Sequence, residues 1–453
     1  MRNIPGEPSS GAEALRPGPA LVALIVAFRI ALPLVTIDPT WEFHRDEFLY
    51  FAMGDHFHLF GMQFPPLIAA LARISKAIFG DDVLAARAPA ALAGAAVMGA
   101  MVVLAIRLGA GRWAVILIAL ASVAAPALLR TSVLFHPVVF DQLWCLLAVA
   151  GAVLAAAERN PRWWLLTGVA LGLGALTKFS AAFYGVSLAL PVLLIPELRR
   201  QLATRWPWLG AGLAALLATP SITGQVVNHW PFLGQMQSLR AQQLEHVAPL
   251  QFLLTQPLLL GAASVLVIAG LLAAIRGDVP ARVAGLFAVA LVGLMLVMNG
   301  KAYYAAPGYP ALIALGALEL QRRGRVVKTA IPAFVAVGAM VLLPMGIPVF
   351  APEEMARYAH RIGVSAAIRT NRSEVLTLPQ DYADMLGWRR QAEAAARVWR
   401  TLTPAEQADG ILAGSNYGEA GALAMYHQRL GLPYPVASTG ISTPGVSGRG
   451  AAS

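Results

Sequence analysis

Two adjacent acidic residues, Asp46 and Glu47, follow directly after the first long apolar segment of the chain. A carboxylate beside a bilayer bears a desolvation cost, so it needs a structural partner or a chemical task. One of the two could take a proton from an acceptor hydroxyl while the other orients the acceptor or a metal. Alternatively, acids in the first turn of a helix simply complement its dipole. We favour catalysis, because two acids near a membrane cost more than a helix cap returns.

A third acid, Asp141, lies at the outer end of another apolar segment, in the sequence Phe140-Asp141-Gln142. Such a position would let it converge on Asp46 and Glu47 across one cavity. An acid near a helix N-terminus is the equally weighted alternative.

Two isolated lysines, Lys178 and Lys301, occupy short connections between apolar segments. Each could bind a phosphate as a point charge. Each could also extend to a lipid headgroup, and for a single lysine that explanation is the better one. Two lysines on the acid-bearing side favour an anionic lipid substrate instead.

Histidines and acids also cluster around Asp46, and they raise the possibility of a divalent metal site. Their oxygen and nitrogen atoms suit zinc or manganese, but no spacing among them is diagnostic. The candidate ligands are Glu42, His44, Asp46, Glu47, Asp55, His56 and His58, with His44, Glu47 and His56 foremost. No cofactor is otherwise indicated. The sequence has no phosphate-binding P-loop and no dinucleotide GxGxxG motif after a strand, so use of a nucleotide sugar is unsupported.

The elements that must position these residues are membrane-spanning helices. Of the 453 residues, 58% are hydrophobic and only 13% are charged, a balance typical of lipid-facing helices. The net charge of +10 is best explained by membrane topology, and no nucleic-acid partner is expected. The single cysteine, Cys145, excludes an intramolecular disulfide.

About eleven apolar stretches approach the ~20 residues that a span requires. The first is expected to be a retained anchor, because no small-residue cleavage pattern follows it. The stretches are Ala20–Ile37, 84–106, 114–130, 138–157, 163–177, 179–196, 207–223, 257–275, 283–298, 305–320 and 329–350.

The connections between these stretches alternate in positive charge, which predicts the topology. Positive loops stay in the cytoplasm. One set of loops is rich in arginine and is therefore placed inside: Arg107 and Arg112, Arg159 and Arg162, Arg199, Arg200 and Arg205, Arg276 and Arg282, and Arg322 to Lys328. The N-terminus is then cytoplasmic, whereas Asp46, Glu47 and the C-terminus lie outside.

Four regions are expected along the chain. Residues 1–19 form a cytoplasmic tail, and 20–350 form the transmembrane domain with an amphipathic outer loop over 38–83. Residues 351–436 have a soluble composition, with a helix over Asp381–Thr401, a short strand over 410–414 and a helix over Gly418–Leu430. This predicts a small extracytoplasmic α/β domain. Residues 437–453 are rich in Gly, Ser and Thr, which is typical of disorder.

Taken in order, several motifs resemble those of bacterial polytopic glycosyltransferases of the protein-mannosyltransferase and aminoarabinose-transferase type, which are similar to glycosyltransferase family 39. The matching segments are Arg45-Asp46-Glu47, Gln63-Phe64-Pro65-Pro66-Leu67, Phe140-Asp141-Gln142-Leu143-Trp144, 172–178, 300–310, 378–385 and 415–421. The resemblance extends from about residue 20 to about residue 435.

The resemblance implies a mainly α, polytopic membrane protein of the GT-C type in the bacterial inner membrane. It implies transfer of a sugar from a polyprenyl-phosphate donor to a hydroxyl of a lipid, glycan or protein acceptor outside the cytoplasm. Asp46 would be the catalytic base, with Glu47 and Asp141 shaping the acceptor or metal site. The groups near the donor phosphate would be Arg45, Lys178, Lys301, Tyr303 and Tyr304.

Two other classes of function compete with this one. A lipid or glycan transporter would carry charges within its spans and matching broken helices in two halves, whereas here the acids cluster at one membrane face. A membrane-anchored protein that binds a partner through residues 351–453 would not need so many spans. From the residues and the resemblance together, we expect an inverting glycosyltransferase.

Overall fold

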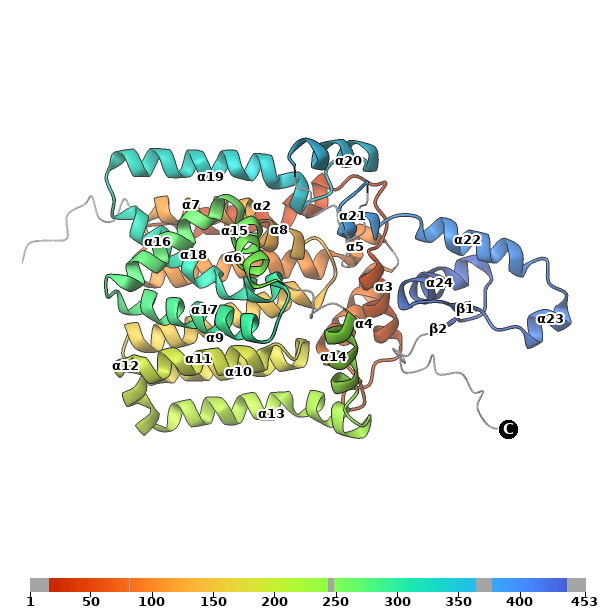
Figure 1. Cartoon of the computed structure of the whole chain (residues 1–453), viewed down its shortest axis with the longest axis horizontal. Helices are drawn as coiled ribbons and strands as arrows, with labels where there is room; N and C mark the ends of the chain where they lie inside the picture. Colours follow the sequence, from red (N-terminus) through yellow and green to blue (C-terminus); the bar gives the residue numbers. More distant parts are fainter. Residues whose placement is uncertain (1–15, 81, 243–247, 364–376, 438–453) are drawn as a thin grey trace, which may run out of the picture.

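The computed structural model describes residues 16–80, 82–242, 248–363 and 377–437, and they are mainly helical. Long helices run side by side as a bundle, and a group of shorter helices covers one end of it (Figure 1). The terminal segments 1–15 and 438–453, including most of the tail expected to be disordered, lie outside the described residues.

Seven helical segments of the described chain are long and apolar enough to cross a membrane, or eight if one bent pair counts as a span. An α-helix rises about 1.5 Å per residue, so 18 or more apolar residues match a hydrocarbon core of about 30 Å. The seven are α2 (Pro19–Thr36), α6 (Ala88–Arg107), α9 (Pro137–Ala157), α13 (Arg205–Val227), α15 with α16 (Pro249–Ile275), α17 (Val279–Val297) and α19 (Arg325–Gly346). The bent pair joins α11 (Ala181–Leu194) to Pro196–Ala203 through an angle of 103°.

The expected count of about eleven spans is not shown, because several apolar helices are shorter than a span. These are α7 (Arg112–Ala124), α10 (Trp164–Thr177) and α18 (Pro310–Gln321). Proline and irregular backbone cut the corresponding sequence stretches: Pro126 begins a separate short helix, α8 (Pro126–Thr131), and a 3-10 turn over Ala302–Gly308 precedes α18. Lys178 does separate two helices, since α10 ends just before it and α11 begins at Ala181.

Small residues allow the long helices to approach closely. A Cβ atom added at Gly168 of α10 would collide with the backbone carbonyl of Gly210 in α13, and one added at Gly316 of α18 would collide with the carbonyl of Leu266 in α16. Glycine at helix crossings is the usual device of membrane bundles, because the hydrophobic effect does not drive helices together in lipid.

The arginine-rich connections meet at one end of the bundle. Arg107 pairs with Glu158, Arg276 with Glu319 and Arg322 with Asp278, which joins several of these loops to one another. Trp113 donates its indole N–H to the carbonyl of Lys328, which adds another loop to the group. The sequence placed these connections on one side of the membrane, and the structure brings them together.

The opposite end carries the segment that follows α2. It contains α3 (Arg45–Asp55), α4 (Leu67–Phe79) and α5 (Val83–Ala86). α4 begins directly after Pro65-Pro66, because proline fits the start of a helix but not its interior. Phe43, which precedes α3, packs edge-to-face against Phe48 and Phe51 of α3, and the ring of Phe135 stacks on Phe51. This aromatic cluster fixes the start of α3, where Asp46 and Glu47 lie.

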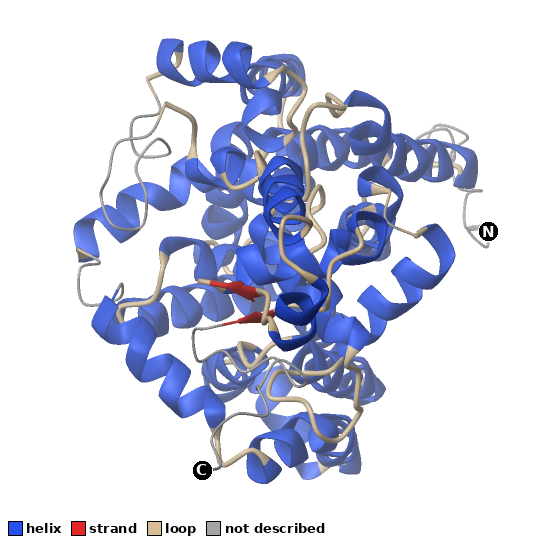
Figure 2. Ribbon diagram, turned by 90° about the vertical axis from the view of Figure 1, so that its right-hand side faces the viewer, coloured by secondary structure: helices blue, strands red, loops and turns tan. Residues whose placement is uncertain are grey.

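The chain beyond α19 folds against this same end. It forms α20 (Pro352–Arg361), α21 (Gln380–Ala383), α22 (Trp388–Trp399), α23 (Pro404–Asp409) and α24 (Tyr417–Leu430), with strands β1 (Ala413–Gly414) and β2 (Val436–Ala437). β1 and β2 pair in parallel, Ala413 with Val436 and Gly414 with Ala437. Viewed onto this end, the two strands lie over the middle of the bundle (Figure 2).

The expected C-terminal α/β domain is therefore not shown, because its sheet is reduced to two strands of two residues each. The expected helix over Asp381–Thr401 is also divided. It breaks into α21 and α22 because Gly387 adopts φ 86°, a left-handed conformation that interrupts a helix. The expected helix over Gly418–Leu430 is present as α24.

The span Pro249–Ile275 consists of α15 (Pro249–Leu260), the 3-10 turn Gly261–Ala263 and α16 (Ser264–Ile275). The remaining short elements are α12 (Pro196–Arg199), α14 (Pro231–Gln242) and the 3-10 turns Pro161–Trp163 and Arg200–Ala203.

Candidate active site

Asp46 lies in the first turn of α3, with a partner on each of its carboxylate oxygens. The hydroxyl of Tyr417 in α24 donates to Oδ1 at 2.7 Å. Nε2 of His136, at the start of α9, lies 3.5 Å from Oδ2. The backbone N–H of Asp46 donates to Nδ1 of His44, which caps the helix. Two segments far from α3 in sequence, the starts of α9 and α24, therefore hold one half-buried carboxylate.

The pKa of Asp46 reflects these partners. Burial raises it, but the contact with His136, the field of His44 and the hydrogen bond from Tyr417 together hold the pKa well below its ordinary value. Asp46 is therefore ionised at neutral pH. An ionised carboxylate has about four lone-pair sites, so each oxygen can still accept a hydrogen bond from an incoming hydroxyl.

Glu47, the next residue, occupies a quite different environment. Its carboxylate is fully buried and receives Arg87 Nε at 2.9 Å on Oε1 and Arg87 Nη2 at 2.6 Å on Oε2. The backbone N–H groups of His44 and Phe135 complete the shell, both at 2.7 Å. Burial alone would raise the pKa of Glu47, but Arg87 and these amides keep it below its ordinary value.

The expected catalytic pair is thus divided by geometry. Glu47 is buried, so its surroundings favour a positioning role: it ties the start of α3 to the start of α6 and to the segment before α9. Its expected catalytic role stays a prediction. Asp46 keeps about a quarter of its side chain exposed and carries the chemistry more readily.

Asp141 lies one turn inside α9, beyond the helix N-terminus, so a simple dipole role does not account for it. It is buried and accepts hydrogen bonds from Ser180 Oγ at 2.8 Å and Tyr184 OH at 2.5 Å. Lys178 and His136 both lie within electrostatic range of its carboxyl group. Asp141 is therefore near the Asp46 site, because His136 contacts Asp46 and also lies within electrostatic range of Asp141.

The expected phosphate-binding residues gather at the same end. Lys178 Nζ lies 5.0 Å from the ring centroid of Tyr304, and that ring meets Tyr303 edge-to-face at 4.6 Å. Burial lowers the pKa of Lys301, Asp46 raises it, and the positive charges of Lys178 and Arg45 lower it again. Lys301 therefore lies within electrostatic range of Asp46, Lys178 and Arg45.

Arg45 is held between two acids. Its Nη2 lies 3.4 Å from Asp384 Oδ2, and its Nε lies 3.7 Å from Asp46 Oδ1. The guanidinium also lies 5.4 Å from the ring centroid of Tyr417. Arg45 therefore links α3 to the C-terminal segment and to Asp46.

The three foremost metal candidates do not form a ligand set. His44 caps α3 and faces Asp384 at 3.9 Å, Glu47 is bound to Arg87, and His56 packs edge-to-face on Tyr434. Across the described part of the chain, no three His, Cys, Asp or Glu side chains are grouped so that they could hold a metal ion.

The sequence interpretation missed His136, Arg87 and Tyr417 as members of the site. His136 lies just before an apolar stretch and Arg87 lies near the start of one, so the sequence indicated that both are near a membrane surface. It did not indicate their partners. Tyr417 lies inside one of the motifs that carried the family resemblance, although nothing in the sequence linked it to Asp46.

The fold and this site define an integral membrane protein whose acids, lysines and tyrosines converge at one end of a helical bundle. Residues 63–223 match the family model described as dolichyl-phosphate-mannose-protein mannosyltransferase. The resemblance predicted from the motifs is thereby confirmed over a segment that includes Asp141 and Lys178.

Solved structures with a similar fold include two crystal structures of ArnT from Cupriavidus metallidurans. The apo structure is 18% identical with a TM-score of 0.62, and the similarity covers 92% of this chain and 85% of that one. The structure bound to undecaprenyl phosphate is also 18% identical, with a TM-score of 0.66 and coverage of 94% and 87%. The expected GT-C type of fold is confirmed at this level. No match is found among curated protein sequences.

Proposed function

We propose that this protein is a membrane glycosyltransferase that moves a sugar from a polyprenyl-phosphate donor to an acceptor hydroxyl. The observation that carries the proposal is the partly exposed carboxylate of Asp46 at the same end of the bundle as Arg45, Lys178 and Lys301. A similar fold in ArnT has been crystallised with undecaprenyl phosphate, a lipid phosphate of the required kind.

In this proposal Asp46 accepts the proton of the acceptor hydroxyl as its oxygen attacks the anomeric carbon. The bond from that carbon to the lipid phosphate breaks, and the lipid phosphate leaves with the electron pair. Lys178 and Lys301 stabilise the charge that develops on it, because fixed cations in a partly dry site act strongly on a growing anion. A single displacement of this kind inverts the anomeric configuration.

The other acids support this step without exchanging protons with the substrate. Glu47 accepts hydrogen bonds from Arg87 on both of its carboxylate oxygens. This ion pair holds the first turn of α3 in place and so sets the direction of the Asp46 side chain. Asp141, held by Ser180 and Tyr184, lies near Lys178 and so helps to orient that lysine. Of the expected catalytic residues, we therefore assign proton transfer to Asp46 alone.

A reconstituted assay tests this function. Purified protein in liposomes would receive a polyprenyl-phosphate sugar, and consumption of the donor would be followed with Asp46→Asn beside the wild type. A general base contributes about 10²–10⁴-fold to the rate, so Asp46→Asn should lose that much turnover and still bind the donor.

The matched control is Asp55→Asn, which changes the same residue type at the other end of α3. Asp55 pairs with Lys76 at the surface, away from the site. Its variant should turn over like the wild type. Equal turnover of Asp46→Asn and wild type would contradict the assignment of the base.

A further inference from the structure

We propose that Tyr417 is a positioning residue for Asp46, and that the C-terminal segment carrying it is a built-in part of the active site. This inference rests on the proposed function and adds a residue that neither the motifs nor the comparisons assign to the site. Its basis is the way α24 and the segment before α22 are joined to α3.

The start of α24 is set by its own sequence. The side chain of Asn416 accepts hydrogen bonds from the backbone N–H of Gly418 at 2.9 Å and of Glu419 at 3.1 Å. Asparagine is among the preferred residues at this capping position. Tyr417 is therefore the first residue of α24, where its side chain extends beyond the helix end toward α3.

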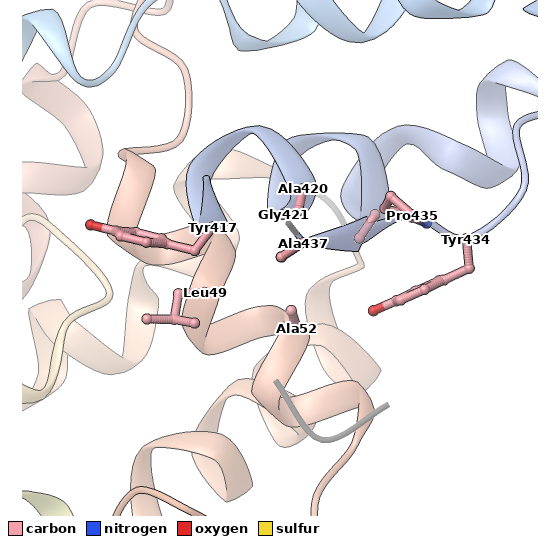
Figure 3. A pocket seen from close by; sticks show the side chains of 9 residues that line it. Leu49, Ala52, Tyr417, Ala420, Gly421, Tyr434, Pro435 and Ala437 are labelled. Carbon is pink, nitrogen blue, oxygen red and sulfur yellow. The ribbon is translucent and has the colours of Figure 1, made fainter. Parts of the chain in front are cut away.

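Two glycines let α24 lie directly on α3. A Cβ atom added at Gly421 would lie 2.6 Å from Cβ of Phe48, and one added at Gly418 would collide with Cγ of Arg45. Leu49 and Ala52 of α3 line one pocket with Ala420 and Gly421 of α24, and the ring of Tyr417 at the start of α24 lies beside Leu49 (Figure 3). A larger residue at either glycine would move the Tyr417 hydroxyl away from Asp46.

A second connection fixes the approach to α3. The backbone N–H of Glu42 donates to the carbonyl of Met385, and that of Arg45 donates to the carbonyl of Asp384, both at 3.0 Å. The backbone N–H of Arg389 donates to the side chain of Glu42 at 3.0 Å. The residues just before Asp46 are thus held by the C-terminal segment through main-chain bonds.

That segment is anchored in turn to the bundle. Tyr382 donates its hydroxyl to the carbonyl of Pro344 near the end of α19, and its ring meets Trp41 edge-to-face at 5.2 Å. Arg130 lies over the same ring at 4.3 Å. The C-terminal segment is therefore attached to the membrane helices as well as to α3.

The carboxylate of Asp46 is therefore contacted from two sides. His136 belongs to the membrane bundle and approaches Oδ2, whereas Tyr417 belongs to the C-terminal segment and donates to Oδ1. Without the Tyr417 hydroxyl, Oδ1 would be free to turn toward the guanidinium of Arg45, 3.7 Å away. A displacement of about 1 Å in a reacting group costs on the order of 10²-fold in rate.

The test compares Tyr417→Phe with Tyr434→Phe. The first removes the hydroxyl but leaves a ring beside Arg45. The second removes a hydroxyl from the same C-terminal unit that has no hydrogen-bond partner among the described residues. Tyr417→Phe should lower kcat roughly 10- to 100-fold with KM for the donor within about twofold. Tyr434→Phe should match the wild type, and a Tyr417→Phe enzyme that also did so would overturn the proposal.

A spectroscopic measurement keeps this inference separate from the proposed function. The infrared difference between wild type and Asp46→Asn isolates the carboxylate stretch of Asp46, which responds to hydrogen bonding whether or not the enzyme turns over. A shifted band in Tyr417→Phe supports the positioning role, and an unshifted one refutes it. If the wild type fails to consume any polyprenyl-phosphate sugar, the function fails, but this band still decides the role of Tyr417.

Discussion

At the scale of single residues, Asp46 and Glu47 show how neighbouring side chains of one chemical type can take opposite tasks. Successive residues in a helix point about 100° apart, so one acid faces the site and the next faces the protein interior. Glu47 meets Arg87 there with both oxygens, and Asp46 meets donors that leave it room for a substrate. The proposed chemistry depends on this division.

The Glu47–Arg87 pair predicts a specific loss of stability. Arg87→Met leaves a buried carboxylate without its counter-ion, so the free energy of unfolding should fall by about 3–5 kcal/mol. Titration with SDS in mixed micelles would measure it. The control is Arg107→Met, which breaks an exposed pair with Glu158 and should cost less than about 1 kcal/mol. Equal stability of the two variants would contradict the structural role of Glu47.

The same pair gives a pH dependence with a definite sign. The pKa of Glu47 is lower in the folded protein than its ordinary value of 4.5. Its contribution to stability is therefore complete above pH 4.5 and is lost as the pH falls through the folded-state pKa. In Arg87→Met this acid-dependent part of the stability should shrink or vanish.

The sequence indicated many of the residues of this site, because an acid, lysine or arginine beside an apolar stretch is conspicuous. Asp46, Asp141, Lys178 and Lys301 all lie at one end of the bundle. The partners of these residues could not be predicted. The contact from Tyr417 to Asp46 spans 371 positions of the chain and depends on how two helices pack, which a local pattern does not encode.

At the scale of elements, close helix crossings depend on glycines whose surroundings differ within one helix. Gly210 and Gly212 both belong to α13, but a Cβ atom at Gly210 would meet the carbonyl of Trp164, whereas one at Gly212 would meet nothing within 4 Å. Packing also explains why several helices end at other residues than the sequence predicted. Apolar composition shows where helices are, but packing, prolines and bends decide where they end.

These two glycines provide a matched prediction. Gly210→Leu should force α13 away from α10 and destabilise the protein by about 1–3 kcal/mol or more, because overpacking shifts the backbone. Gly212→Leu places the same side chain toward open space and should change stability little. Thermal unfolding in detergent, read from tryptophan fluorescence, would compare them. Similar midpoints would show that the α10–α13 crossing is not tightly packed.

At the scale of the whole molecule, the two ends of the bundle differ in chemistry. At one end, arginines of one loop pair with acids of another. The other end carries Asp46, Lys178 and Lys301, and the C-terminal segment contacts Asp46 there. Loops rich in Lys and Arg remain cytoplasmic. We therefore propose that the site opens on the extracytoplasmic side, where a lipid-linked sugar rather than a nucleotide sugar would be the donor.

Cysteine labelling in intact cells tests this orientation with little background, since Cys145 is the single cysteine of the sequence and is fully buried. Ile411→Cys lies in the C-terminal segment at a side chain that is 75% exposed. It should react with a membrane-impermeant maleimide added outside. Gly324→Cys, in the loop before α19, should react only after the cells are made permeable. If only Gly324→Cys were labelled in intact cells, the topology would be the opposite of the one proposed. Asp46 would then lie on the cytoplasmic side, away from any extracytoplasmic acceptor.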